Sequence, residues 1–175
     1  LSPNDAYALA SQRCKLVTSH ERWPLGSTAP EDVQLREDCE WDDARFISHF
    51  FPSMATEPFN PMHLDFFVER QARRGSRGHR DATASPRGSA KTSVKGKAAI
   101  IKDILYRHER YMAICSANDD LARDKVKDIR DEFTTNGELI RVYGPQHTRD
   151  WRMSDFITAN ACRVRAFTPR TKVRG

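Results

Sequence analysis

Apolar residues recur every three or four positions in several stretches of the chain, a spacing that places them on one face of a helix. Ser2 and Pro3 fit the start of a helix over residues 2–20, and Pro52 ends a second helix over residues 28–51. Asn136-Gly137 is typical of a helix end, here after a helix that turns Leu121, Val126, Ile129 and Phe133 inward. The helices are expected over residues 2–20, 28–51, 59–68, 94–105 and 119–135.

Short apolar runs bounded by polar residues predict strands between these helices. The run 111–115 is expected to be a buried strand of a parallel sheet, with Cys115 as a small core residue. Runs 156–158 and 164–167 are expected to form a hairpin. Weaker strand signals lie at 79–84 and 139–143. Strands that alternate with helices indicate an α/β fold.

The stretch 85–93 reads Ser-Pro-Arg-Gly-Ser-Ala-Lys-Thr-Ser and joins a weak strand to a helix. Phosphate-binding loops surround phosphate oxygens with backbone N–H groups, then place a Lys and a hydroxyl residue at the start of a helix. Lys91 and Thr92 supply that pair. Ser85 and Ala90 stand where the G-x-x-x-x-G-K-[ST] template has glycine, so an ordinary turn before a helix is the alternative.

The loop and the residues after it resemble the N-terminal ATPase region of terminase large subunits of phages and prophages, the motors that pump DNA into capsids. Members of that family often carry small-Pro-Arg-Gly-x-Gly/Ala-Lys-[ST], which 85–92 matches at every position. The resemblance covers about residues 46–175 and is firmest from Ala84 onward. Its further motifs match Ile114 to Ala122, Phe133 to Ile140, Tyr143-Gly144, Trp151 to Phe156, Arg163 to Phe167 and Arg174-Gly175.

The resemblance implies a P-loop NTPase fold of the RecA/helicase-like type, with a mostly parallel sheet flanked by helices. Residues 1–57 would form an N-terminal helical arm, and 58–175 a partial ATPase domain. The chain would stop before the Walker B acidic strand and the family's nuclease domain. ATP and Mg²⁺ are the implied ligands. We therefore expect an ATPase in the full-length protein and negligible turnover in this fragment.

The resemblance also assigns roles in the loop. Lys91 would neutralise charge on the β/γ-phosphate oxygens, Thr92 would ligate Mg²⁺, and Arg87 would act on the γ-phosphate as a sensor or finger. Arg87 as a surface residue paired with DNA or a carboxylate, and His63 as a simple helix-start residue, are the open alternatives. The expected cofactor-binding residues are Ser85, Pro86, Gly88, Ser89, Ala90, Lys91, Thr92 and Ser93, with His63 as an adenine contact by its position before the loop.

Charge is segregated along the chain, whose formal net charge is +5. Residues 31–43 are mainly acidic, which indicates a solvated helix face or a docking surface. Residues 70–80 and 163–174 are basic, which predicts contacts to DNA phosphates or solvated connections. Asp119 and Asp120 follow a strand, but three residues separate them from it. We interpret them as helix N-terminal residues rather than Mg²⁺ ligands.

Several classes are disfavoured. No apolar run approaches the ~20 residues that span a bilayer, so no membrane association is expected. Four scattered cysteines favour a reducing cytoplasm over a zinc site or a disulfide framework. The family implies the host cytoplasm at the procapsid. Its partners would be double-stranded DNA, the capsid portal, the small terminase subunit and further copies in a ring. The alternatives are a nucleotide- or DNA-binding assembly module without turnover and a helicase-like repair ATPase fragment.

Overall fold

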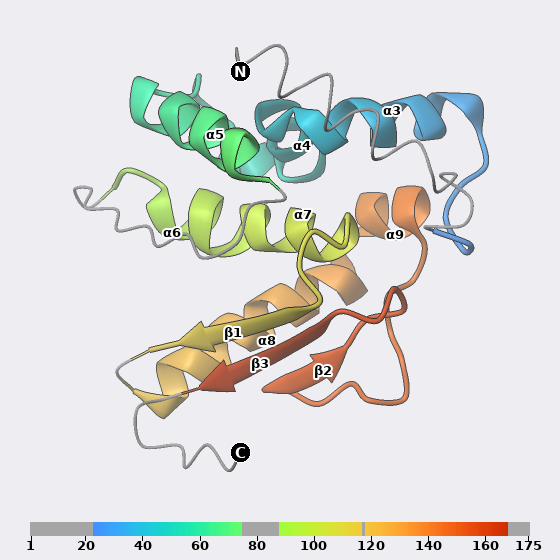
Figure 1. Ribbon diagram of the computed structural model, residues 1–175, viewed down its shortest axis with the longest axis vertical. Coiled ribbons are helices and arrows are strands. Elements are labelled where there is room, and N and C mark those ends of the chain that lie inside the picture. The colour runs from blue at the N-terminus through green and yellow to red at the C-terminus, as the bar shows by residue number, and fades with distance from the viewer. Residues whose placement is uncertain (1–22, 75–87, 117, 168–175) are drawn as a thin grey trace. The chain divides into compact units, whose positions relative to one another are not determined.

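The structure, a computed structural model, describes residues 23–74, 88–116 and 118–167 (Figure 1). It is α/β, with a three-stranded mixed sheet. The chain divides into two compact units, one with Thr28–Ala99 and the residues up to Pro24, the other with Leu25–Ser27 and Ile100–Gly175. The boundary after residue 57 stays a prediction. The helix expected over 2–20 and the strand over 79–84 lie outside the described residues.

The first unit contains α3 (Pro30–Trp41), α4 (Asp43–Phe50), the short 3-10 helix η1 (Pro52–Met54) and α5 (Pro61–Arg73). Proline begins α3 and α5, as its fixed φ favours. The single helix expected before Pro52 is broken at Asp42, whose side chain accepts a hydrogen bond from the Arg45 N–H and caps α4. The core of this unit includes Phe46, Ile47, Phe50 and Phe67, whereas Met62 and Phe66 of α5 are only half-buried.

The acidic run is not simply a solvated face. Asp32 and Asp43 are each only 2% exposed. The Arg70 Nε donates to Asp43 Oδ2 at 3.3 Å, and the Arg74 guanidinium lies 3.8 Å from the same carboxylate. The interpretation as a wholly solvated helix face is therefore wrong, because part of the run pairs with the basic residues that end α5.

One continuous helical stretch follows the loop: α6 (Lys91–Ser93), the π-helical η2 (Val94–Ala98) and α7 (Ala99–Leu105). Lys102 of α7 is fully buried although it carries a charge. The helix expected over 94–105 buries the apolar residues that recur at helical spacing, namely Val94, Ala98, Ile101, Ile104 and Leu105.

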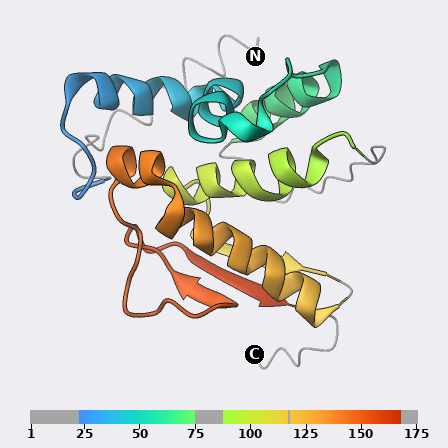
Figure 2. The ribbon, with the colours of Figure 1, turned by 180° about the vertical axis from the view of Figure 1, so that it is seen from behind.

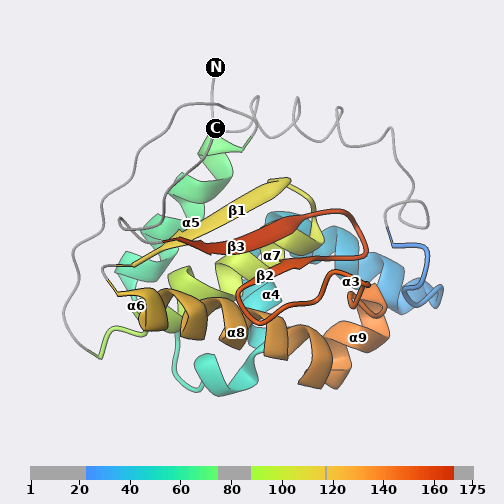
Figure 3. The same cartoon turned by 90° about the horizontal axis from the view of Figure 1, so that it is seen from below.

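The second unit contains the sheet, in the order β1 (Tyr111–Cys115), β3 (Arg163–Phe167), β2 (Asp155–Ile157). β1 and β3 are parallel, and β2 and β3 are antiparallel, which confirms the expected hairpin. Helix α8 (Asp119–Thr135) lies across one face, in front of the strands in Figure 2, and Figure 3 shows the strands side by side with β3 central. The described sheet is thus mixed, where a mostly parallel sheet was predicted.

Three further expectations in this unit are wrong. Within the described sheet β1 lies at an edge, with Tyr111 48% exposed and Cys115 exposed, so it is neither a buried strand nor the site of a core cysteine. Residues 139–143 belong to helix α9 (Gly137–Tyr143), because the Asn136 side chain accepts from the Leu139 N–H and caps a new helix. Leu121, expected to point inward from α8, is 53% exposed.

Gly144, which follows α9, combines a positive φ of 79° with a close backbone approach. A Cβ there would lie 2.5 Å from the Leu25 carbonyl carbon, whereas a Cβ at Gly137 would meet nothing within 4 Å. We expect Gly144→Ala to lower the free energy of unfolding by about 2 kcal/mol or more. Alanine is strained at this positive φ, and its Cβ would also clash with the backbone of Leu25. Gly137→Ala should change it by less than about 1 kcal/mol. Urea unfolding measures both, and equal effects would contradict this role for Gly144.

Candidate functional site

The described part of the predicted loop is Gly88–Ser93; Ser85, Pro86 and Arg87 lie outside the described residues. Gly88 has φ 82° and Ala90 has φ 51°, so two left-handed residues flank Ser89 just before α6. The Val94 N–H donates to the Ala90 carbonyl at 2.9 Å. This bond joins an N–H to the carbonyl four residues earlier, as in a helix. The N–H groups of residues 91–93 come before it, at the helix start, where N–H groups lack an acceptor within the helix. Left-handed residues that turn successive N–H groups to one side create concavities suited to anions.

His63 contacts this loop directly. Its Nε2 donates to the Ser89 carbonyl at 2.8 Å, and its side chain is buried, with the residue 7% exposed. Asn60 caps α5 by accepting from the His63 N–H at 3.0 Å, and the Phe59 ring packs edge-on at 5.9 Å. Nδ1 has no hydrogen-bond partner among the described residues. The structure thus brings His63 and the loop together through the loop backbone, while an adenine contact stays a prediction.

Ala90 occupies the position of the template's second glycine. Its positive φ is the conformation that glycine adopts without steric cost and that other residues adopt at a cost of roughly 1–2 kcal/mol. The sequence therefore departs from the template at a position where the backbone still takes the conformation that favours glycine.

The side chains around the loop have different environments. Thr92 is exposed and Ser93 half-buried. Lys95, one turn further on, places its Nζ 3.9 Å from the centroid of the Phe66 ring, a cation–π contact that joins this helical stretch to α5. Sequence reasoning did not identify Lys95. A half-exposed aromatic residue in α5 and a lysine near the start of the next helix gave no specific signal for the pair.

Asp119 and Asp120 lie in the first turn of α8, whose cap is Asn118, and both are exposed. This confirms their interpretation as helix N-terminal residues. Among the residues that the structure describes, no group of three or more His, Cys, Asp or Glu side chains could hold a metal ion. Thr92 therefore remains the sole proposed Mg²⁺ ligand within the described part of the chain.

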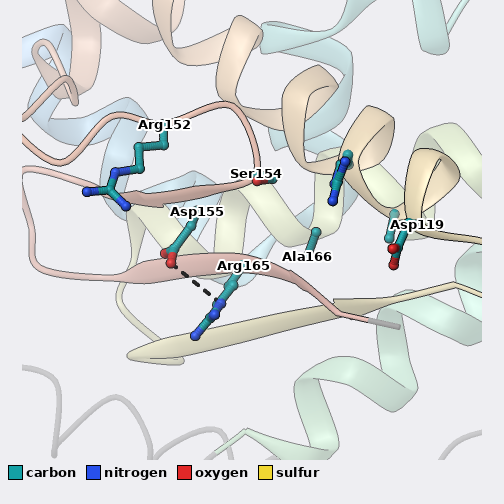
Figure 4. Close-up of a pocket in the computed structure, with 8 residues that line it drawn as sticks. Asp119, Arg152, Ser154, Asp155, Arg165 and Ala166 are labelled. Atoms are coloured by element: carbon teal, nitrogen blue, oxygen red, sulfur yellow. Dashed lines mark ion pairs between the residues drawn. The ribbon is translucent and has the colours of Figure 1, made fainter. Parts of the chain in front are cut away.

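A second feature lies in the other unit, at the start of α8. A cavity of about 290 Å³ is lined by residues that include Arg123, Arg152, Ser154 and Arg165 (Figure 4). Asp155, also at its wall, accepts hydrogen bonds of 2.8 and 2.7 Å from Arg163. This pairing, with smaller contributions from Arg165 and Arg152, holds the pKa of Asp155 below its ordinary value. Sequence reasoning had marked only the segment containing Arg165 as basic.

No family model matches the chain, and no curated protein or solved structure matches it either. None of the helices in the described ranges has the length and apolar character needed to cross a membrane. The terminase resemblance therefore rests on the sequence motifs alone.

The backbone at Ala90 gives a direct test of the loop conformation. We expect Ala90→Val to lower the free energy of unfolding by about 1 kcal/mol or more, because a β-branched residue strongly disfavours positive φ. Ala90→Gly should cause no loss, since relief of strain offsets the extra entropy of the unfolded chain. Ala113→Val makes the same change at an exposed position in β1. It should not lower the free energy of unfolding, because valine favours the strand conformation. Equal effects of the two valine substitutions in urea unfolding would rule out the left-handed loop.

Proposed function

We propose that the chain carries the nucleotide-binding loop of a DNA-packaging ATPase of the terminase large-subunit type, and that Mg²⁺-ATP binds at Gly88–Ser93. The observation that supports this most is the pair of left-handed residues, Gly88 and Ala90, directly before a helix that begins with Lys91 and Thr92. An ordinary turn before a helix needs neither feature. The contact from His63 holds the same loop.

The residues of the loop suit a triphosphate. Backbone N–H groups from Gly88 to Lys91 would cradle its oxygens, and Lys91 would neutralise charge that develops on the β/γ-phosphates. Thr92 would offer its hydroxyl to Mg²⁺, which when bound supplies further charge neutralisation. Arg87 would act on the γ-phosphate. His63 would serve as a positioning residue, because it contacts the loop backbone at Ser89.

In the complete motor, ATP hydrolysis would drive double-stranded DNA through a ring of such subunits, docked on the capsid portal with the small terminase subunit in the host cytoplasm. Part of the basic sequence that could contact DNA is already paired within the chain. Arg70 and Arg74 lie against Asp43, and Arg163 against Asp155. This pairing favours weak DNA binding by the isolated chain, with strong binding left to the assembled ring.

A second candidate is an assembly module that binds nucleotide or DNA without turnover. It is favoured by the position of Asp119 and Asp120, which are exposed residues in the first turn of a helix. A carboxylate that holds Mg²⁺ and orients water has to be fixed opposite the loop hydroxyl. Measured ATP turnover separates the two candidates, since only the ATPase, in its complete form, releases phosphate steadily.

Lys91→Ala should weaken Mg²⁺-ATP binding about tenfold or more, because hydrogen bonds between charged groups contribute roughly 1.5–3 kcal/mol. Isothermal titration calorimetry on the 175-residue chain measures the affinity. Lys127→Ala, which removes an exposed lysine from α8, is the matched control and should bind like the wild type. If the two variants bind ATP with the same affinity, the loop does not hold the phosphates.

A further inference from the structure

The sheet of the second unit has an open face on the side away from α8. Residues directly opposite each other on neighbouring strands point their side chains to the same face of a sheet. One face carries the fully buried Val164 and Phe156, and α8 lies across it. The other face, the open face, is turned to the viewer in Figure 1. The pairing of the strands places on it Tyr111, Ala113 and Cys115 from β1, Arg163, Arg165 and Phe167 from β3, and Asp155 and Ile157 from β2.

Two aromatic rings and an arginine lie together on the open face. The ring centroids of Tyr111 and Phe167 are 6.4 Å apart, and the Arg165 guanidinium lies 5.1 Å from the centroid of the Phe167 ring. The neighbours of Tyr111 on this face of β1 are Ala113 and Cys115, which are small and exposed. The tyrosine ring is therefore left uncovered, with the residue 48% exposed. The open face thus offers an aromatic ring for stacking, with a cation nearby.

The open face keeps a positive charge in spite of its ion pairs. Arg163 is the main reason why the pKa of Asp155 is lowered, and Arg165 and Arg152 contribute to the same shift. Asp150 also attracts Arg163, less strongly than Asp155 does. Three guanidinium groups thus act on one central carboxylate. Each guanidinium has five N–H donors, so Arg163 and Arg165 keep donors for a further acceptor.

This combination matches the chemistry of a single nucleic-acid strand. An unpaired base can stack on an exposed aromatic ring, and arginines beside the ring can contact the phosphates of its strand. Sheets that bind single strands present their aromatic residues on an open face, as this sheet does. In a duplex the bases are already stacked on one another and cannot reach the ring. A duplex would therefore contact the arginines alone.

We propose that the open face binds single-stranded nucleic acid, with a base stacked on Tyr111 and the phosphate backbone passing Arg163 and Arg165. The ring of Phe167 holds the Arg165 guanidinium beside this base through their cation–π contact. Stacking and phosphate contacts do not read the identity of a base, so binding should hardly depend on sequence. This inference does not depend on the function proposed for the loop, because no residue of the loop takes part.

The test measures binding of a labelled oligothymidine to the 175-residue chain by fluorescence anisotropy. An oligomer of about eight nucleotides is within the usual site sizes for single strands. Tyr111→Leu removes the ring but keeps an apolar side chain, and it should weaken binding about fivefold or more. Tyr111→Phe keeps the ring and should bind like the wild type.

Substitution of an arginine tests the contact to the phosphates. Arg165→Gln should weaken binding about threefold or more, and affinity should fall less steeply with salt. Arg141→Gln is the matched control and should leave both unchanged. Arg141 is a partly exposed arginine of the same unit, and like Arg165 it has a carboxylate partner, Glu138.

Two further measurements separate stacking from charge and from misfolding. A duplex of the same length should bind Tyr111→Leu and the wild type alike. In the unmodified chain, added oligothymidine should move the NMR signals of the Tyr111 ring, because a stacked base changes the local ring current. The proposal is overturned if oligothymidine does not bind, if Tyr111→Leu and Tyr111→Phe bind it equally, or if the ring signals stay unchanged at saturation.

Discussion

The hydrogen bond from the His63 ring to the Ser89 carbonyl joins two segments that are 26 residues apart in the sequence. Gly88 and Ala90 on either side of Ser89 are exposed, so the loop has little packing of its own. A loop binds phosphate well only if its N–H groups are already oriented before the ligand arrives. In the proposed site, the hydrogen bond from the buried His63 side chain, which the Asn60 cap and the Phe59 ring hold in place, would provide that orientation.

Elements determined by local chemistry could be predicted from the sequence. Helix α8 has apolar residues at helical spacing and an asparagine cap, and Ala122, Val126, Ile129 and Phe133 are buried as this pattern requires. The strand prediction for residues 139–143 is wrong because Leu-Ile-Arg-Val-Tyr is short. Five residues do not distinguish the helical spacing of apolar residues from the alternation of a strand. The deciding feature was Asn136, which ends α8 and caps α9 at once.

Properties that depend on tertiary placement could not be predicted in this way. An apolar run such as Tyr111–Cys115 indicates a strand, but not whether the strand lies at the centre or the edge of the sheet. The charged segments show the same limit, since Asp43 and Arg70 belong to separate runs in the sequence and pair in the fold. The cavity at the start of α8 is lined by residues from separate elements, so no single segment of the sequence indicated it.

The central claim is that the loop Gly88–Ser93, held by His63, binds the phosphates of Mg²⁺-ATP. Titration of the ¹⁵N-labelled chain with Mg²⁺-ATP, followed by NMR, tests it most directly, because each backbone N–H reports its own environment. The account predicts saturable chemical-shift changes at the amides of Gly88 to Ser93, accompanied by changes at the His63 ring. Unchanged loop amides at ATP concentrations that saturate shifts elsewhere in the protein would contradict it.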